Sequence, residues 1–358
     1  MALTFYLLDE NFDVFEILEN YKSAIWTGRY SKSGDFELYL PATKALIDAV
    51  NIGNGITKRY ICRGDEPSKC GIVERVAITT DVENGNFLTI AGRTIESMIF
   101  KRIVKRQTTY TGSPKEIIYR LVTNSLIDPD LPIRAVEGLK IERSELSTDD
   151  IIITQQFDGA NVGEAIEGLC QAYRIGYKIT FDITNKEFIF KLYEGTDRST
   201  NQSEVPPVVF SNDFNNLISS NYGVDIANKK DLALVAGEGE GTARKKVEVG
   251  AMGQGLLMSE MYINAQTIST NDGEMTETTY RKALTQQGYN ALLDNSITTA
   301  ADGEVAPNYG FILNQDYFLG DIVSIENEYG VKMAPRVVEI IEAQDETGYS
   351  IIPTFAND

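Results

Sequence analysis

Histidine is absent from the 358 residues of this chain, and its absence excludes whole classes of chemistry. A Ser-His-Asp triad, a Cys-His nucleophile pair, a histidine general base and a histidine metal ligand all require that side chain. Cysteine is scarce too, since Cys62, Cys70 and Cys170 are an odd set without CxxC spacing. We expect buried, reduced thiols, with Cys62 and Cys70 able to face each other across a hairpin, and no zinc site.

Long hydrophobic runs are also missing, because no stretch approaches the roughly 20 apolar residues that cross a bilayer. The segment Met1–Glu10 runs into acidic residues and lacks the basic start of a signal peptide. We therefore expect a strand near the N-terminus, no signal peptide and no stable membrane insertion. With 42% hydrophobic and 24% charged residues, the composition is that of a soluble globular protein of two or three domains.

Positive charge is scarce, since 33 Lys and Arg stand against 52 Asp and Glu and the net charge is −19. Arg244-Lys245-Lys246 is the longest uninterrupted basic run. Tight binding to phosphate needs clustered cations, so the composition disfavours tight binding of nucleic acid. Two explanations fit the acidity. Like charges keep the protein soluble by self-repulsion or, alternatively, they form a surface along which DNA passes without binding.

Two stretches near opposite ends of the chain resemble one another. Each begins a strand with Val-Glu, ends it in an acidic turn with glycine, and continues into a second strand. The parts are Val73-Glu74, Asp81–Gly85 and Phe87–Ile90 within residues 55–93, and Val338-Glu339, Asp345–Gly348 and Tyr349–Ile352 within residues 320–355. This similarity predicts one β-module present twice, and three such chains would supply six modules to a ring.

Apolar runs of strand length alternate with turn signals through the first hundred residues. We predict the strands Leu3–Leu8, Val14–Leu18, Ala24–Tyr30, Asp35–Leu40, Gly55–Ile61, Gly71–Thr80 and Phe87–Ala91, with a short helix Thr43–Val50. Trp26, the one tryptophan, is expected to pack in a core or between modules.

The middle of the chain carries helix signals. Ser113 and Glu116 form a capping box, Asn161 begins a second helix in the same way, and Gly176 is placed to end that helix. Two strands are expected to follow, Tyr177–Ile183 and Glu187–Leu192.

Residues 195–207 are polar and contain proline, so we expect a linker or crossover there, fixed by a local ion pair within Asp197-Arg198-Ser199. Beyond it we predict the paired strands Leu232–Gly237 and Lys245–Val249 and a long helix, Thr278–Asp294, before the second β-module. The fold class is then α+β and β-rich. Two β-barrel-like tube modules, residues 1–104 and residues 205–358 with a helical insertion, flank a smaller α+β domain of residues 105–204, and the two modules are expected to touch.

The segment Ala236–Thr242 (AGEGEGT) invites a phosphate-loop assignment, but it meets neither known glycine spacing. As a strand it would place Glu238 and Glu240 on one face and leave the glycines as a bare strip for close packing. We therefore predict a structural role for this segment.

Three acidic doublets suggest a glycosidase, since two carboxyl groups suffice for that reaction. They are Asp9-Glu10, Asp149-Asp150 and Asp345-Glu346. Each lies in an expected turn, and neighbours on a strand point to opposite faces, so a doublet does not converge on a substrate. We predict no catalytic residue, no cofactor-binding residue and no metal ligand.

Motifs along nearly the whole chain resemble a family of siphophage tail-tip (baseplate) hub proteins from phages and prophages of Gram-positive bacteria. They are Leu7–Asp9, Ile25–Tyr30, Gly34–Ala42, Leu192–Gly195, Asp197–Ser199, Val209–Ser211, Phe214–Leu217, Leu234–Gly241 and Tyr317–Val323. All are scaffold motifs, so no catalytic residue is carried over from them.

The resemblance implies a non-enzymatic virion protein, similar to the N-terminal hub part of tail-associated lysins and to the central hub of contractile tails. It implies a homotrimer at the virion tail tip, assembled in the bacterial host cytoplasm, whose ring has pseudo-six-fold symmetry. Expected partners are the distal tail protein ring, the tape measure protein and further tail-tip or fibre proteins, with DNA passing through unbound and no cofactor. Two alternatives stay open: a carboxylate-based glycan or peptidoglycan hydrolase, and a host-surface-binding module.

Overall fold

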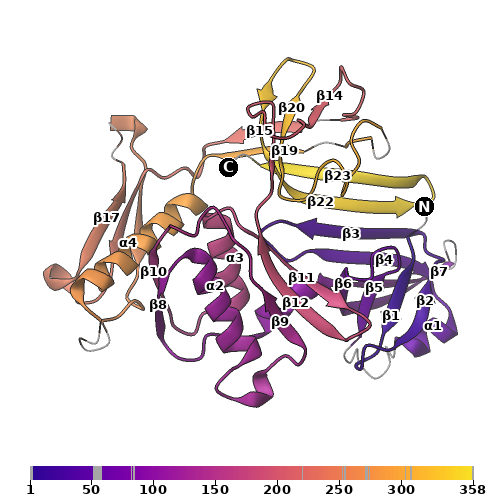
Figure 1. Ribbon diagram of the computed structural model, residues 1–358, viewed down its shortest axis with the longest axis horizontal. Coiled ribbons are helices and arrows are strands. Elements are labelled where there is room, and N and C mark those ends of the chain that lie inside the picture. Colours follow the sequence, from indigo (N-terminus) through magenta and orange to yellow (C-terminus); the bar gives the residue numbers. More distant parts are fainter. Residues whose placement is uncertain are drawn as a thin grey trace.

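The computed structural model describes residues 3–50, 59–81, 83, 85–219, 221–251, 253, 255–270, 273, 275–302, 304–306 and 309–356 (Figure 1). The first module confirms the two predicted hairpins and the short helix, which begins after the N-cap Thr43. The first four residues of the predicted strand Gly55–Ile61, and Val82 and Asn84 of the predicted turn, lie outside the described residues. The elements are β1 (Phe5–Leu8), β2 (Val14–Leu18), β3 (Ser23–Arg29), β4 (Asp35–Pro41), α1 (Lys44–Ala49), β5 (Tyr60–Arg63), β6 (Cys70–Asp81), β7 (Gly85–Thr94) and the 3-10 helix η2 (Ile95–Lys101).

The predicted helix starts of the middle domain are confirmed. The Ser113 side chain accepts from the Glu116 N–H, and Asn161 accepts from the N–H groups of Gly163 and Glu164. The elements are β8 (Thr108–Gly112), α2 (Pro114–Val122), the π-helical turn η3 (Thr123–Ile127), the 3-10 turn η4 (Pro132–Arg134), β9 (Leu139–Glu142), β10 (Ile153–Phe157), α3 (Val162–Ala172), β11 (Gly176–Asp182) and β12 (Glu187–Tyr193).

The predicted role of Gly176 as the residue that ends α3 is wrong. Arg174 takes the left-handed conformation there, with φ of 57°, and Gly176 opens β11 instead. A Cβ on Gly176 would lie 2.3 Å from the ring of Tyr30, so the glycine is required by close packing.

The C-terminal part confirms the predicted pairing of β16 with β17 and the long helix α4, which packs beside them (Figure 1). The expected linker also contains a short strand, β13, which pairs in parallel with β20. The elements are β13 (Asp197–Arg198), β14 (Val209–Ser211), β15 (Asn221–Asp225), β16 (Leu232–Ala236), η5 (Gly241–Ala243), β17 (Lys246–Gly250), η6 (Gly255–Leu257), β18 (Glu260–Asn264), α4 (Glu277–Asp294), β19 (Thr298–Asp302), β20 (Ile322–Glu326), β21 (Lys332–Met333), β22 (Arg336–Asp345) and β23 (Gly348–Ala356).

One continuous sheet joins the two β-modules, in the order β15-β19-β23-β22-β3-β4-β7-β6-β5-β1-β2. The predicted contact between the modules is confirmed, because β3 and β22 pair side by side from Ser23↔Asp345 to Arg29↔Glu339 (Figure 1). The β-rich α+β class is also confirmed. In the described part of the chain, however, the modules are not separately closed barrels. β3 of the first module pairs with β22 of the second, and the sheet of described strands ends at β2 and β15.

The two similar stretches form matching hairpins, β6–β7 and β22–β23. Each has a bulge on its first strand, at Glu74 and at Val338, and each bulge lies seven residues before the aspartate of the turn. The bulges align Glu74 with Val338, so the pairing of Val73-Glu74 with Val338-Glu339 inferred from the sequence is one residue out. The repeat is nevertheless visible in the structure as two hairpins of matching geometry. In each hairpin the bulge bends the first strand and increases its twist.

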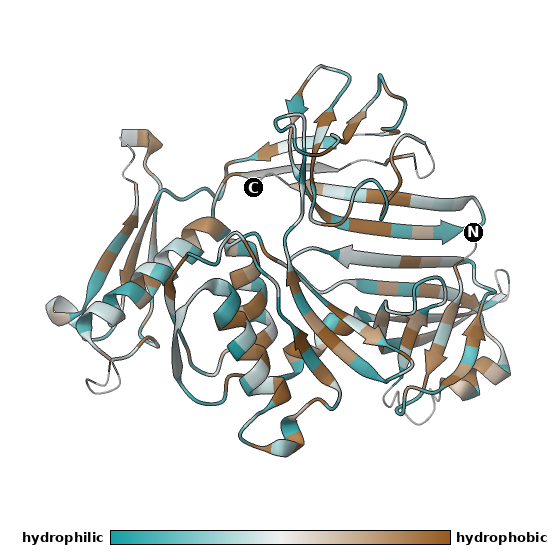
Figure 2. Ribbon diagram, viewed as in Figure 1, coloured by the Kyte–Doolittle hydropathy of each residue, from teal (hydrophilic) through white to brown (hydrophobic). Residues whose placement is uncertain are grey.

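Four clusters of buried apolar side chains lie in the described residues, and Figure 2 shows hydrophobic residues along the strands and helices that hold them. The first module, the second module, and the β16–β18 sheet with α4 each have a cluster. The fourth belongs to the middle domain and extends into the first module through Leu8, Cys62, Cys70 and Ile72. We propose that the boundaries between the two modules and the middle domain lie at residues 104 and 204.

No helix in the described part of the chain is both long enough and apolar enough to span a membrane.

Candidate functional site at the junction of the modules

The seam between β3 and β22 is the place where the modules meet. Trp26 lies directly opposite Glu342 across this pair of strands. Its side chain is buried and stacks on Phe36, with ring centroids 5.5 Å apart. The predicted packing role of Trp26 is confirmed, and the seam is built around a charged residue of the second module.

Glu342 belongs to a buried ionic cluster that links β5 to β22. Its carboxylate accepts from Arg63 Nη1 at 2.5 Å, from Lys69 Nζ at 3.1 Å and from Tyr349 Oη at 2.7 Å. Arg63 also donates through Nε and Nη2 to Asp65, at 3.0 and 2.5 Å. The side chains of Arg63 and Glu342 are only 2% and 7% exposed. Removing either partner would therefore leave a buried charge with too few partners.

The cluster sets the charge state of Glu342. Burial alone would raise the pKa of this carboxyl, but the positive charges of Lys69 and Arg63 and the hydrogen bonds from Arg63 and Tyr349 lower it to about 2. Glu342 is thus ionised at neutral pH and holds the two modules together as a carboxylate.

Tyr30, which directly follows β3, joins both modules to the middle domain. Its hydroxyl donates to the carbonyl of Arg174 at 2.8 Å, and the Arg336 guanidinium lies over its ring at 5.2 Å. Gly176 and Gly320 leave room for that ring, since a Cβ on either would lie within 2.4 Å of it.

Asp321 fixes the crossover back to the second module. Its buried carboxylate accepts from Arg198 Nε at 2.8 Å and from the N–H groups of Thr196 and Phe318, at 2.7 and 3.0 Å. The predicted local ion pair within Asp197-Arg198 is wrong, because neighbours on a strand point to opposite faces. The Asp197 carboxylate accepts from the N–H of Ser199 instead.

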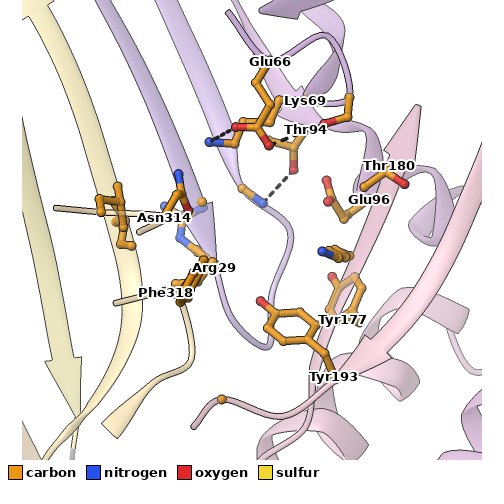
Figure 3. A pocket seen from close by; sticks show the side chains of 18 of the residues that line it. Arg29, Glu66, Lys69, Thr94, Glu96, Tyr177, Thr180, Tyr193, Asn314 and Phe318 are labelled. Carbon is orange, nitrogen blue, oxygen red and sulfur yellow. Dashed lines mark hydrogen bonds and ion pairs between the residues drawn. The ribbon is translucent and has the colours of Figure 1, made fainter. Parts of the chain in front are cut away.

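A cavity of about 440 Å³ opens at this junction (Figure 3). Asn314 and Phe318 of the second module lie on one side, and Glu96, Thr180 and Tyr177 lie on the other. Burial raises the pKa of Glu96, whose carboxylate accepts from the Ile179 N–H at 3.1 Å.

Acids and bases in equal number share the cavity wall: Arg29, Lys32, Lys69, Lys178 and Arg198 against Glu66, Glu96, Glu194, Asp321 and Glu342. Most are engaged with one another or with backbone groups, as in Glu66–Lys69 and Arg198–Asp321. The arrangement holds three parts of the chain together. In the described residues, no group of three or more Cys, Asp or Glu could hold a metal ion.

The glycine-rich segment differs from its prediction. β16 ends at Ala236, and Gly239 and Gly241 have φ of 93° and 54°, so the segment turns rather than continuing as a strand. Glu238 points inward and accepts from Ser269 Oγ at 2.9 Å, whereas Glu240 is exposed. The close packing expected of the glycines is found at Gly237, where a Cβ would lie 2.0 Å from Tyr280 Oη.

The first residue of each acidic doublet serves its own turn or a nearby cation. Asp9 accepts from two backbone N–H groups of its turn, Asp149 pairs with Lys115 at 2.5 Å, and Asp345 accepts from the Thr347 N–H. The structure does not bring the doublets together at one site.

Cys62 and Cys70 are direct partners across β5 and β6, as the sequence allowed. Both are buried free thiols, and burial raises the pKa of Cys70. The proximity of Cys62 raises it further.

Sequence reasoning missed the buried pair Arg63–Glu342, because residues 279 positions apart carry no local signal of contact. It also passed over a basic segment, Lys101–Arg106 (KRIVKR), whose four cations are interrupted by two apolar residues. Counting cations within a window of several residues, rather than in unbroken runs, would have found this segment.

Comparison with known proteins gives both a family and a fold. The family model described as Siphovirus ReqiPepy6 Gp37-like protein matches residues 4–357. No curated protein matches the chain. A tail protein from Neisseria meningitidis is similar in structure, with 9% identity and a TM-score of 0.59, over 100% of this chain and 97% of that one.

Two further solved structures share the fold over nearly their whole length. The 43 kDa tail protein of prophage MuSo2 from Shewanella oneidensis has 13% identity and a TM-score of 0.55, over 99% of this chain and 98% of that one. The prophage tail protein gp18 from Listeria monocytogenes has 11% identity and a TM-score of 0.54, over 100% and 95%. The shared fold agrees with the resemblance drawn from the sequence motifs, and the match over residues 4–357 settles the family: the chain belongs to the Siphovirus ReqiPepy6 Gp37-like proteins.

Proposed function

We propose that this chain is a structural subunit of the phage tail hub, three copies of which form a ring of pseudo-six-fold symmetry. The ring joins the tail tube and distal tail protein to the tail tip and surrounds the DNA exit channel. The observation that carries the proposal is the repeated bulged hairpin, β6–β7 and β22–β23, set in one continuous sheet. Two equivalent modules in each of three chains give six.

The ends of the sheet supply a means of closing such a ring. β2 and β15 are each five residues long, and among the described strands each pairs with one neighbour. Unpaired edges are templates for another strand. Both edges also expose apolar side chains: Val14 and Ile17 on β2 are 46% and 53% exposed, and Tyr222 and Val224 on β15 are 41% and 54% exposed. Pairing β15 of one copy with β2 of the next is a heterologous contact, which closes when the rotation per copy is 120°.

Charge supports a channel that does not retain DNA. Three copies carry 3 × −19 = −57 charges, and a wall of the same sign as DNA opposes binding to it. The tape measure protein and further tail-tip or fibre proteins remain the partners we propose above and below the ring.

Nothing in the described residues favours the hydrolase or host-binding alternatives over this proposal. The acidic doublets lie apart from one another in turns, and the junction cavity is lined by groups that hold modules together.

Electron microscopy of the purified chain, with and without the upstream tail protein, tests the proposal. We expect three-fold rings with six densities around a pore. Val224→Lys should abolish the rings, because it places a charge on the β15 edge, whereas Leu256→Ser, at a still more exposed position on η6, should leave them intact. Monomers that stay ringless with the upstream protein present would refute the proposal, and assays of glycan turnover and host-cell binding would then decide between the alternatives.

A further inference from the structure

A basic patch lies where the first module meets the middle domain of this strongly acidic protein. Lys101–Arg106 contributes four cations, and Arg134 of η4 adds a fifth beside them. Arg102 Nε donates to the Arg134 carbonyl and Arg134 Nη2 donates to the Ile103 carbonyl, each at 2.9 Å. These bonds lock the two segments together. Both guanidinium groups donate to backbone carbonyls there, so their charges are not cancelled by acids at those contacts.

The surface between these segments is hollow. A depression of about 420 Å³ is lined by Lys101, Arg102, Lys105 and Arg134 together with two isoleucines, and no acid lines it. Arg106 pairs with Asp130 at 3.1 Å, but Lys101 and Lys105 make no ion pair of 4 Å or less with described residues. The patch therefore presents at least two exposed lysines that make no close ion pair with a described residue.

Exposed aliphatic side chains surround the cations. Ile133 is 92% exposed, and Ile103 and Leu131 are 49% and 45% exposed. Ile133 and Leu131 lie on the connection between α2 and β9, which forms the lower end of the molecule in Figure 1. Asp128 and Asp130 are also exposed on this connection, and Asp130 pairs with Arg106. An exposed apolar turn beside Lys and Arg is nevertheless a combination that places aliphatic groups in a lipid interface and cations at its headgroups.

We propose that this patch docks the chain reversibly on an anionic lipid bilayer. Charge complementarity favours that surface, since the local cations act within a Debye length while the net charge of −19 is screened beyond about 8 Å. The lining of the depression offers no aromatic ring on which a nucleic-acid base could stack. Nearly complete exposure of Ile133 at a turn suits shallow burial among lipids, which is peripheral contact rather than insertion. The inference goes beyond the hub proposal and does not depend on ring formation.

Sedimentation of the full chain with vesicles tests it. We expect binding to vesicles of phosphatidylcholine mixed with phosphatidylglycerol, weakening with salt, and little binding to phosphatidylcholine alone. Lys101→Gln/Lys105→Gln should weaken binding about 25-fold, because each cation near an anionic surface contributes about fivefold. Ile133→Ser should weaken it about tenfold through the lost apolar burial.

Matched controls distinguish an effect of the patch from a general effect of positive charge or of exposed apolar surface on vesicle binding. Lys246→Gln/Lys282→Gln removes the same charge from an exposed site elsewhere, and Leu256→Ser removes an exposed aliphatic group. Both should bind as the unsubstituted chain does. Equal binding to the two kinds of vesicle, or equal losses in patch and control variants, would overturn the proposal. So would loss of ring assembly in the patch variants with vesicle binding unchanged, which would make the patch a protein contact.

Discussion

Replacing Arg63 by Met should destabilise the protein far more than the same change at Arg93. Arg63→Met leaves Glu342 buried with Lys69 as its one ion-pair partner among the described residues and removes both hydrogen bonds to Asp65. Removing one partner of a buried pair costs about 3–5 kcal/mol. Arg93 makes a comparable two-pronged contact with Glu74, but its side chain is 41% exposed, so that pair contributes about 0–1 kcal/mol.

The cluster also predicts how stability depends on pH. The pKa of Glu342 is about 2 in the folded chain against 4.5 for an ordinary glutamate, a difference worth roughly 3 kcal/mol. Because the folded pKa is the lower one, this stabilisation is present above the unfolded pKa and is lost as pH falls from about 5 towards 2. Glu342→Gln should be less stable at neutral pH and should lose less stability on acidification.

Trp26 provides the assay, because it is the one tryptophan and lies opposite Glu342 in the sheet. Urea unfolding followed by its fluorescence, at neutral and acid pH, should be compared for the unsubstituted chain, Arg63→Met, Glu342→Gln and the control Arg93→Met. Equal losses in Arg63→Met and Arg93→Met would refute the energetic reasoning. A Glu342→Gln curve parallel to that of the unsubstituted chain across the acid range would refute the pKa assignment.

Two further predictions concern close packing and thiol chemistry. Gly176→Ala should cost about 1–3 kcal/mol in unfolding free energy because its Cβ would meet Tyr30 at 2.3 Å, whereas Gly168→Ala, with nothing within 4 Å on α3, should gain up to about 1 kcal/mol. The same urea titration measures both, and a loss at Gly168 equal to that at Gly176 would contradict the packing argument. Burial raises the pKa of Cys70 and Cys170, so iodoacetamide at mildly alkaline pH should leave the folded chain unmodified and label all three cysteines after unfolding. Labelling of the folded chain, read by mass spectrometry, would show that these thiols are accessible.

Local signals in the sequence predicted most elements and their class. Alternation of apolar and polar residues gave the hairpins of β1–β4, and the caps Ser113 and Asn161 placed the starts of α2 and α3. These succeed because the determining interactions span only a few residues. The end of α3 was wrong for the complementary reason: Gly176 serves a contact with Tyr30, 146 positions away, and no local pattern reports such a contact.

The sequence by itself determined the acidic charge, the absence of histidine chemistry, the order of strands and helices, and the presence of a repeated β-module. All of these follow from composition or from interactions between near neighbours along the chain. Only the tertiary structure decided that the two modules share one open sheet through β3 and β22, and that Arg63 and Glu342 form a buried pair at their seam. It also placed Arg134 beside Lys101–Arg106, turning scattered cations into one patch. Strand pairing across the seam and burial of charge depend on which distant segments exclude water together, and that is settled by packing of the whole chain.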